Sequence, residues 1–293
     1  MSRSPGGKLK YYLIAALLIL AMAAIIRLLL PEKTVVNEHA GQVSVFDGYD
    51  WIWMTPFENV ATSTIYEEDF KSINGSPTYV GREYQTEIGI DVSEHQLDIN
   101  WTAAAEVLDF AYIRIGYRGY TEGGIFQDPW YERNISGASA AGLDTGVYFF
   151  SQAVNVGEAI EEAEYVIAHL AGHEVDLPVM YDWEKVDGGG ARTDVLSEQT
   201  MTDCALAFCR TIENAGYEAG VYFNRNIGYH GLDLSRLTDY AFWLSVPGPY
   251  PDFYYAAEFW QYTFTASVPG VSGEADLNMR FIPLPQDYPL SSP

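Results

Sequence analysis

Residues 177–184 read Leu-Pro-Val-Met-Tyr-Asp-Trp-Glu, a short apolar run that ends in two acids. The run predicts a buried strand, and Pro178 suits a strand entrance, where a missing N–H costs little. Asp182 and Glu184 are two positions apart, so in a strand both carboxylates point to one face, with Cα atoms roughly 6.6 Å apart. Two acids at the C-terminal end of such a strand are typical of the active mouth of an α/β barrel. The competing interpretation is that both acids simply face water.

The chain around this run alternates strands with helices. Strands are predicted at 88–93, 111–115, 146–150, 219–223, 241–246, 258–262 and 275–281. Helices are predicted at 101–108, 129–141, 156–171, 197–215 and 234–237, the second with Asp128 as its N-cap and Pro129 at its first position. Alternation over roughly 200 residues predicts a mostly parallel sheet, most simply a β/α barrel. We expect an irregular barrel, because a Gly-rich turn instead of a helix joins the last two strands.

Composition narrows the function classes. The chain has 293 residues with 16 basic and 40 acidic side chains, a formal net charge of −24. Nucleic-acid binding is not expected, because it requires clustered Lys and Arg. Tyr and Trp are abundant, and such rings either line a sugar groove or fill the core. Cys204 and Cys209 are five positions apart in a predicted helix, a poor geometry for a disulfide, so we expect two buried thiols.

The N-terminus predicts a membrane anchor. Residues 1–10 are basic and are expected in the cytoplasm, and residues 11–30 are apolar except for Arg27. The alternative is a signal peptide cleaved after Ala21-Met22-Ala23, but the apolar run continues past that point. Either interpretation places the body outside the membrane. Residues 31–85 are expected to form a stalk or a small β-rich accessory segment, followed by a catalytic domain at 86–285.

Further acids and aromatic residues fall on the predicted strands. Asp91 ends the first strand and Asp276 begins the last, and these strands are neighbours in a closed barrel. A shared mouth would then hold both acids together with Asp182 and Glu184. Possible sugar-binding side chains on strands are Tyr148, Tyr222, Trp243, Trp260 and Gln261. Clustered acids with flanking rings suit glycoside hydrolysis, which needs a proton donor, a second carboxylate and flat surfaces for sugars.

At this point the chain resembles glycoside hydrolase family 25, the lysozymes or N-acetylmuramidases. The resemblance covers about residues 88–281. It rests on six motifs in order: Gly89-Ile90-Asp91-Val92-Ser93 with Gln96, Gly146-Val147-Tyr148-Phe149-Phe150, Asp182-Trp183-Glu184, Phe242-Trp243-Leu244, Trp260-Gln261-Tyr262 and Asp276-Leu277-Asn278. The family often has His where this chain has Phe149, a departure that does not touch the acids.

The resemblance implies a function and a role for each acid. It implies cleavage of the β-1,4 bond between N-acetylmuramic acid and N-acetylglucosamine in peptidoglycan, with no cofactor and no metal. Glu184 matches the general acid and Asp182 its carboxylate partner, while Asp91 and Asp276 match the other acids of the site. The family is thought to retain anomeric configuration with help from the substrate's 2-acetamido group, which Asp182 would orient.

Two other function classes stay open on sequence. Four acids at a barrel mouth suit a metal-dependent hydrolase with His95 or His230 as ligands, although neither His lies in a ligand-spaced motif. A non-catalytic cell-wall-binding module is the other alternative, and the presence of Asp182 and Glu184 argues against it.

Overall fold

The computed structural model describes residues 18, 20–22, 39–170, 172–186 and 188–285. The chain divides into two units, Met1–Gln42 and Val43–Pro293. The expected cytoplasmic segment 1–10 lies outside the described residues, as does the expected anchor 11–30 apart from residues 18 and 20–22. None of the helices in the described part of the chain has the length and apolar character needed to span a bilayer.

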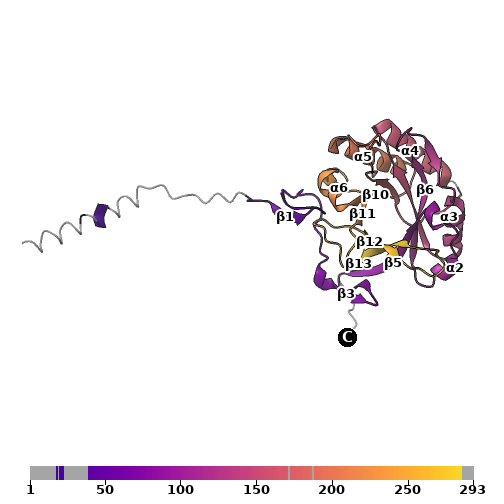
Figure 1. The fold of residues 1–293 in the computed structure, drawn as a ribbon, viewed down its shortest axis with the longest axis horizontal. Coiled ribbons are helices and arrows are strands. Elements are labelled where there is room, and N and C mark those ends of the chain that lie inside the picture. The colour runs from indigo at the N-terminus through magenta and orange to yellow at the C-terminus, as the bar shows by residue number, and fades with distance from the viewer. Residues whose placement is uncertain (1–17, 19, 23–38, 171, 187, 286–293) are drawn as a thin grey trace, which may run out of the picture. The chain divides into compact units, whose positions relative to one another are not determined.

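A closed barrel of strands forms the centre of the second unit (Figure 1). Within the described residues, eight strands make up the barrel: β5 (Tyr84–Val92), β6 (Phe110–Arg118), β8 (Asp144–Ser151), β9 (Val179–Trp183), β10 (Ala219–Asn224), β11 (Ala241–Ser245), β12 (Phe259–Ala266) and β13 (Ala275–Pro283). Pairing of β5 with β6 closes the ring. The predicted barrel is therefore confirmed.

The irregularity lies in the last strand. β13 runs antiparallel to both of its neighbours, β12 and β5, whereas the other pairs around the ring are parallel. A short connection that lacks a helix can only return the chain antiparallel, so the Gly-rich turn before β13 dictates this direction. A further strand, β7 (Ile125–Gln127), extends β6 on its outer edge and was not predicted.

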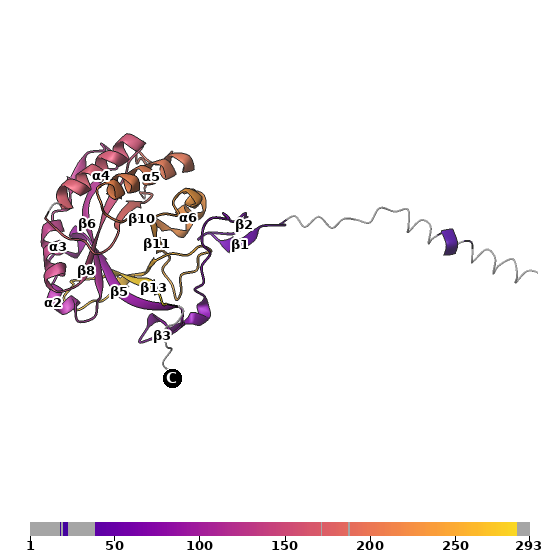
Figure 2. The ribbon, with the colours of Figure 1, turned by 180° about the vertical axis from the view of Figure 1, so that it is seen from behind.

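Helices cover the outside of the barrel along β6, β8, β9 and β10 (Figures 1 and 2). They are α2 (Trp101–Ala104), α3 (Tyr131–Ala140), α4 (Val156–Leu170), α5 (Glu198–Asn214) and α6 (Arg225–His230), with 3-10 turns at Glu67–Asp69, Glu94–Gln96 and Leu234–Arg236. α5 matches its prediction closely because Ser197 caps its first turn. Two predictions were wrong in detail. α2 ends four residues early, and α3 begins two residues late because Asp128 accepts the N–H of Trp130 instead of capping the helix.

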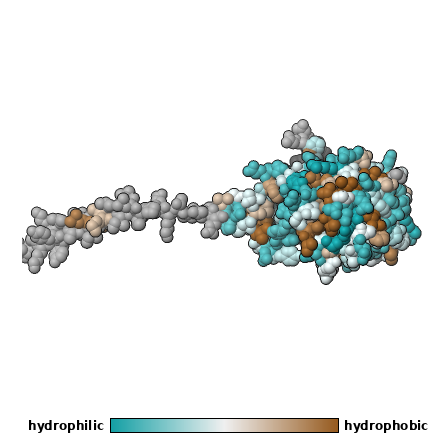
Figure 3. Space-filling view, turned by 90° about the horizontal axis from the view of Figure 1, so that it is seen from above, coloured by the Kyte–Doolittle hydropathy of each residue, from teal (hydrophilic) through white to brown (hydrophobic). Residues whose placement is uncertain are grey.

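Two apolar cores follow from the alternation of side chains along the strands. The lumen is filled by one cluster that includes Phe110, Tyr112, Met180 and Phe259. A larger cluster lies between the strands and the outer elements. Cys204 and Cys209 belong to it as free, buried thiols, which confirms that expectation. The face shown in Figure 3 mixes hydrophilic and hydrophobic residues.

Residues 43–85 form two β-hairpins in the same unit as the barrel. The hairpins pair β1 (Val43–Phe46) with β2 (Trp51–Met54) and β3 (Phe70–Ile73) with β4 (Ser76–Tyr79). The ring of Phe70 lies edge-on to Trp260 at 5.4 Å, and Tyr79 lies edge-on to Phe281 at 5.9 Å. The ring contacts join the second hairpin to strands β12 and β13 of the barrel.

Candidate active site

A cavity of about 590 Å³ opens where the parallel strands of the barrel end. The ends of β5, β8, β9, β10 and β11 and the start of β13 contribute its wall. Eight of the nine predicted site residues line it: Asp91, Tyr148, Asp182, Glu184, Tyr222, Trp243, Gln261 and Asp276.

Strand direction brings the four acids together. Asp182 lies near the end of β9, opposite Tyr222 of β10, and Glu184 follows directly after the strand. Asp91 is the second-last residue of β5, and its register partner on β13 is Asp276. Because β13 is antiparallel, its beginning meets the ends of the parallel strands, so an acid at its start reaches the same mouth.

The environment of the cluster favours protonated carboxyl groups. Burial raises the pKa of Asp91 to about 6. Burial and the charge of Asp91 raise the pKa of Glu184 to about 7, and burial with the charges of Asp91 and Glu184 raises that of Asp276 to about 8. Burial and the same two charges hold the pKa of Asp182 well above its usual range, with Arg114 opposing the shift. Asp182, Glu184 and Asp276 therefore retain protons near neutral pH, whereas Asp91 has the lowest pKa of the cluster and ionises first.

A hydrogen-bonded scaffold holds Asp91. Its Oδ2 accepts from Asn278 Nδ2 at 2.7 Å and from Gln261 Nε2 at 2.9 Å. Gln261 Oε1 accepts from the hydroxyl groups of Tyr222 at 2.8 Å and Ser245 at 2.7 Å. Protein partners thus occupy both ends of the Gln261 amide, which orients Asp91 within the cavity.

The aromatic residues divide into two groups. Trp243 stacks on Tyr112 at 4.6 Å, and its Nε1 donates to Asn278, so it forms part of the cavity floor beside Tyr148. Trp260 does not line the cavity. Its ring is fully buried in the outer core, and its Nε1 donates to the carbonyl oxygen of Val246. Adjacent residues of a strand face opposite sides, so Trp260 must point outward if Gln261 points inward. Its prediction as a sugar-binding residue is corrected accordingly.

Sequence reasoning missed two polar residues of the cavity region. Asn278 was part of a recognised motif, but its bond to Asp91 was not anticipated. It is two residues after Asp276 on the same strand, and this spacing was a usable signal. Arg114 lines the cavity and donates to Asp128 at 2.8 Å and Glu94 at 3.0 Å. Its signal was a cation at the centre of the apolar run Ala111-Tyr112-Ile113-Arg114-Ile115 of β6.

The histidines considered as metal ligands lie in different places. His95 lines the cavity, whereas His230 bonds Asp47 of the first hairpin connection at 2.8 Å. Across the described ranges, no three His, Cys, Asp or Glu side chains are grouped so that they would hold a metal ion.

Two curated lysozymes are similar in sequence to this chain. The chain is 29% identical over 204 residues to Lysozyme M1 from Streptomyces globisporus, covering 65% of this chain and 66% of the relative. It is 28% identical over 193 residues to the autolytic lysozyme of Clostridium acetobutylicum, covering 65% and 54%. The chain thus spans only about two thirds and about half of the lengths of these curated relatives.

Solved structures show the same fold. The modular autolysin LytC from Streptococcus pneumoniae superimposes with a TM-score of 0.59 at 23% identity, covering 82% of this chain and 56% of that one. The lysozyme from Streptomyces coelicolor superimposes with a TM-score of 0.51 at 26% identity, covering 66% and 90%. Residues 90–271 match the family described as Glycosyl hydrolases family 25, so the chain belongs to that family.

Proposed function

We propose that this protein is a muramidase that hydrolyses the β-1,4 bond between N-acetylmuramic acid and N-acetylglucosamine in peptidoglycan. The observation that carries the proposal is the convergence of Asp91, Asp182, Glu184 and Asp276 on one cavity at the barrel mouth. Relatives named as lysozymes support it, as does the LytC structure, which was solved with a synthetic peptidoglycan ligand.

Glu184 is the proposed general acid. Burial and the charge of Asp91 raise its pKa to about 7, so its carboxyl group keeps a proton in mildly acidic and near-neutral solution. It donates this proton to the glycosidic oxygen as the bond to the leaving sugar breaks. A proton donor works best when its pKa lies near the working pH.

Asp182 is the proposed partner of the substrate's 2-acetamido group. Its Oδ1 is buried and has no hydrogen-bond partner among the described residues. Such an acceptor is costly unless a ligand satisfies it. The N–H of the acetamido group is a donor of the right kind, and a bond to Asp182 would orient the acetamido oxygen for attack on the anomeric carbon. Asp91 and Asp276 set the electric field around both groups and hold sugar hydroxyls or water.

The decisive experiment replaces the acid. Glu184→Gln keeps the size of the side chain but cannot deliver a proton, so turnover of purified peptidoglycan should fall about 10²- to 10⁴-fold. Mass spectrometry of the wild-type digest should find the new reducing end on N-acetylmuramic acid. The exposed Glu106→Gln is the matched control and should retain wild-type turnover.

The pH–rate profile provides a second readout. The wild-type rate should decline as pH rises through about 7, because Glu184 then loses its proton. This alkaline limb should disappear in Glu184→Gln. If Glu184→Gln shows normal turnover and an unchanged alkaline limb, Glu184 is not the general acid. The general acid would then have to be Asp91, Asp182 or Asp276.

We also propose that residues 11–30 tether the enzyme in the cell membrane with the catalytic unit outside. The proposal rests on the apolar run and on the basic residues before it. Fractionation should find uncleaved protein in membranes, with the C-terminus open to external protease once the wall is removed. A soluble product that begins near Ala24 would instead establish a cleaved signal peptide.

A further inference from the structure

The backbone of Glu184 lies beyond the hydrogen-bonded ladders of the barrel. The register between β8 and β9 ends with Ser151 opposite Trp183, and that between β9 and β10 ends with Asp182 opposite Tyr222. Among the described residues, none donates a hydrogen bond to the Glu184 carboxyl group. The direction of this side chain therefore depends on how the backbone after β9 is held.

One buried side chain supplies the missing backbone contact. Gln152 follows the last residue of β8, is fully buried, and donates from Nε2 to the carbonyl oxygen of Glu184 at 3.0 Å. A carbonyl oxygen only accepts hydrogen bonds, so the amide must present its NH₂ group on this side. The side chain of Gln152 thus continues the β8–β9 pairing by one residue.

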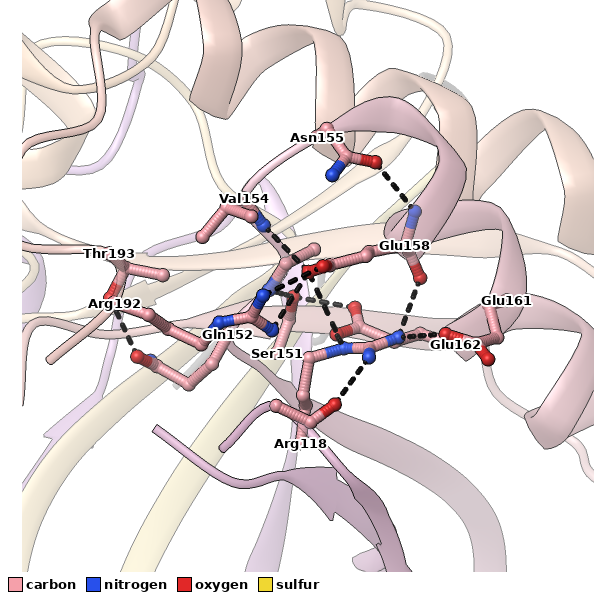
Figure 4. A network of polar contacts seen from close by, with 12 residues as sticks. Arg118, Ser151, Gln152, Val154, Asn155, Glu158, Glu161, Glu162, Arg192 and Thr193 are labelled. Atoms are coloured by element: carbon pink, nitrogen blue, oxygen red, sulfur yellow. Dashed lines mark hydrogen bonds and ion pairs between the residues drawn. The ribbon is translucent and has the colours of Figure 1, made fainter. Parts of the chain in front are cut away.

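A second bond fixes the orientation of that amide. The hydroxyl of Thr193 donates to Gln152 Oε1 at 2.6 Å, and Thr193 is itself buried (Figure 4). Thr193 lies in the connection between β9 and α5. The neighbouring Arg192 anchors this connection to α4 through two bonds to the Glu158 carboxylate, at 2.9 and 2.7 Å (Figure 4). The Gln152 amide, the Thr193 hydroxyl and the Arg192–Glu158 ion pair thus connect the backbone of Glu184 to α4.

We propose that Gln152 is a positioning residue for the reaction, which holds the acid Glu184 in place through its backbone carbonyl, with Thr193 fixing the Gln152 amide. The inference rests on the proposed function, since it concerns the same proton donor. Gln152 itself does not line the cavity, so its effect reaches the substrate only through Glu184.

The test replaces the amide with an apolar chain of similar length. Gln152→Met should lower kcat about 10- to 100-fold, because small displacements of a catalytic group are costly. KM should stay within about twofold, since the cavity wall is untouched. The alkaline limb should also move to lower pH, because a loosened Glu184 gains water and moves away from Asp91, the two causes of its raised pKa.

Two further variants separate positioning from general destabilisation. Ser197→Ala removes the N-cap of α5 and weakens a nearby element, but it should leave kcat and the alkaline limb unchanged at temperatures where the protein is folded. Thr193→Val removes only the hydroxyl that orients the amide. It should lower kcat about threefold and shift the limb in the same direction as Gln152→Met.

The outcomes are distinct. Wild-type protein that fails to cleave peptidoglycan, or Glu184→Gln that cleaves it normally, overturns the proposed function and the inference with it. The second case is one in which the wild type is active and Glu184→Gln is inactive, as the proposed function requires. If Gln152→Met then shows a normal kcat and an unchanged alkaline limb, the inference alone is overturned. If Gln152→Met does not fold, a Thr193→Val variant with wild-type kcat and an unshifted limb overturns it as well.

Discussion

The acids of the cavity and the acids around Arg118 are both packed closely, but they have different partners. Among the described residues that line the cavity, Arg114 is the one Arg or Lys, and its guanidinium is already bonded to Asp128 and Glu94. Each catalytic candidate therefore faces other acids, and burial adds to the cost of its charge. All four pKa values rise.

The Arg118 network between β6 and α4 pairs acids with cations. Arg118 donates to Glu162 at 2.6 Å and to Glu161 at 2.7 Å, and Arg192 binds Glu158 (Figure 4). The hydrogen bonds and charges of its partners lower the pKa of Glu158 even though burial opposes the shift. Burial still raises the pKa of Glu162 to about 7, with Ser151 and Arg118 opposing it.

The two groups of acids are suited to different tasks, proton transfer in the cavity and stabilisation of the fold around Arg118. A buried acid that lacks a cation destabilises the folded state when it is ionised. Its pKa is therefore raised, so it can donate a proton near neutral pH. Glu158, whose cations outweigh its burial, keeps a lowered pKa and is a poor proton donor, whereas deeper burial leaves Glu162 with a raised pKa despite Arg118. Removing charge from the two groups should therefore have opposite effects, and this expectation can be tested variant by variant.

The largest effect is expected from Asp182→Asn. The substitution keeps the shape of the side chain but replaces one carboxyl oxygen with an NH₂ group, which cannot accept the acetamido N–H, so turnover should fall about 10²- to 10³-fold. Glu184 should still titrate, so the alkaline limb should remain visible in the residual activity. A substrate with a very good leaving group should not rescue this variant. The exposed Asp239→Asn serves as control, and equal turnover in both Asn variants would remove Asp182 from the site.

Arg118→Met tests the other group. Its guanidinium is almost fully buried, and its loss leaves the Glu162 carboxyl group buried without a cation. Breaking such a pair costs about 3–5 kcal/mol of folding stability, measured as the shift of a denaturant midpoint. Arg133→Met removes an exposed pair with Asp98 and should cost less than about 1 kcal/mol. Similar losses in both variants would show that the buried network adds no special stability.

The comparison also shows what sequence could predict. β9 and α5 were predictable because an apolar run and the Ser197 cap are local signals. The meeting of Asp91 with Asp276 followed from barrel closure, a property of the whole pattern. β7 and α6 were missed because both are short and are stabilised by tertiary contacts, β7 by pairing with the end of β6.

Side-chain contacts were less predictable than strand positions. Trp260 was assigned to the site although strand alternation places it opposite to Gln261. The bond between Gln152 and Glu184 joins residues 32 positions apart through a side chain and a backbone carbonyl. No local pattern predicts such a contact, because it depends on the exact end of the β8–β9 register.

Asp276→Asn should stabilise the protein in a pH-dependent way. Burial and the charges of Asp91 and Glu184 raise the pKa of Asp276 from 3.8 to about 8. The folded state then holds a proton that the unfolded chain releases above about pH 4, so this group destabilises the fold as pH rises from 4 to 8. Asp276 is partly exposed, and water screens its charge. We therefore expect a gain in melting temperature of about 3–6 °C at pH 8. Little gain is expected at pH 4, and a gain of equal size at both pH values would exclude a charge effect.

Glu158→Gln should give the smallest effect, with the opposite dependence on pH. Its partners, foremost Arg192, lower the pKa of Glu158 below 4.5, so its contribution is present above that pH and is lost as pH falls through the folded value. The ion pair is partly exposed, and the variant should lose about 1 kcal/mol at pH 7. Denaturant unfolding at pH 7 and at about pH 3.5 should show this loss shrinking with acid. Glu106→Gln, at an exposed site, should show no loss at either pH. A loss that persists unchanged in acid would mean that Glu158 acts through its shape and its bond to the Val154 N–H alone, and the contrast between paired and unpaired acids would then not hold at this position.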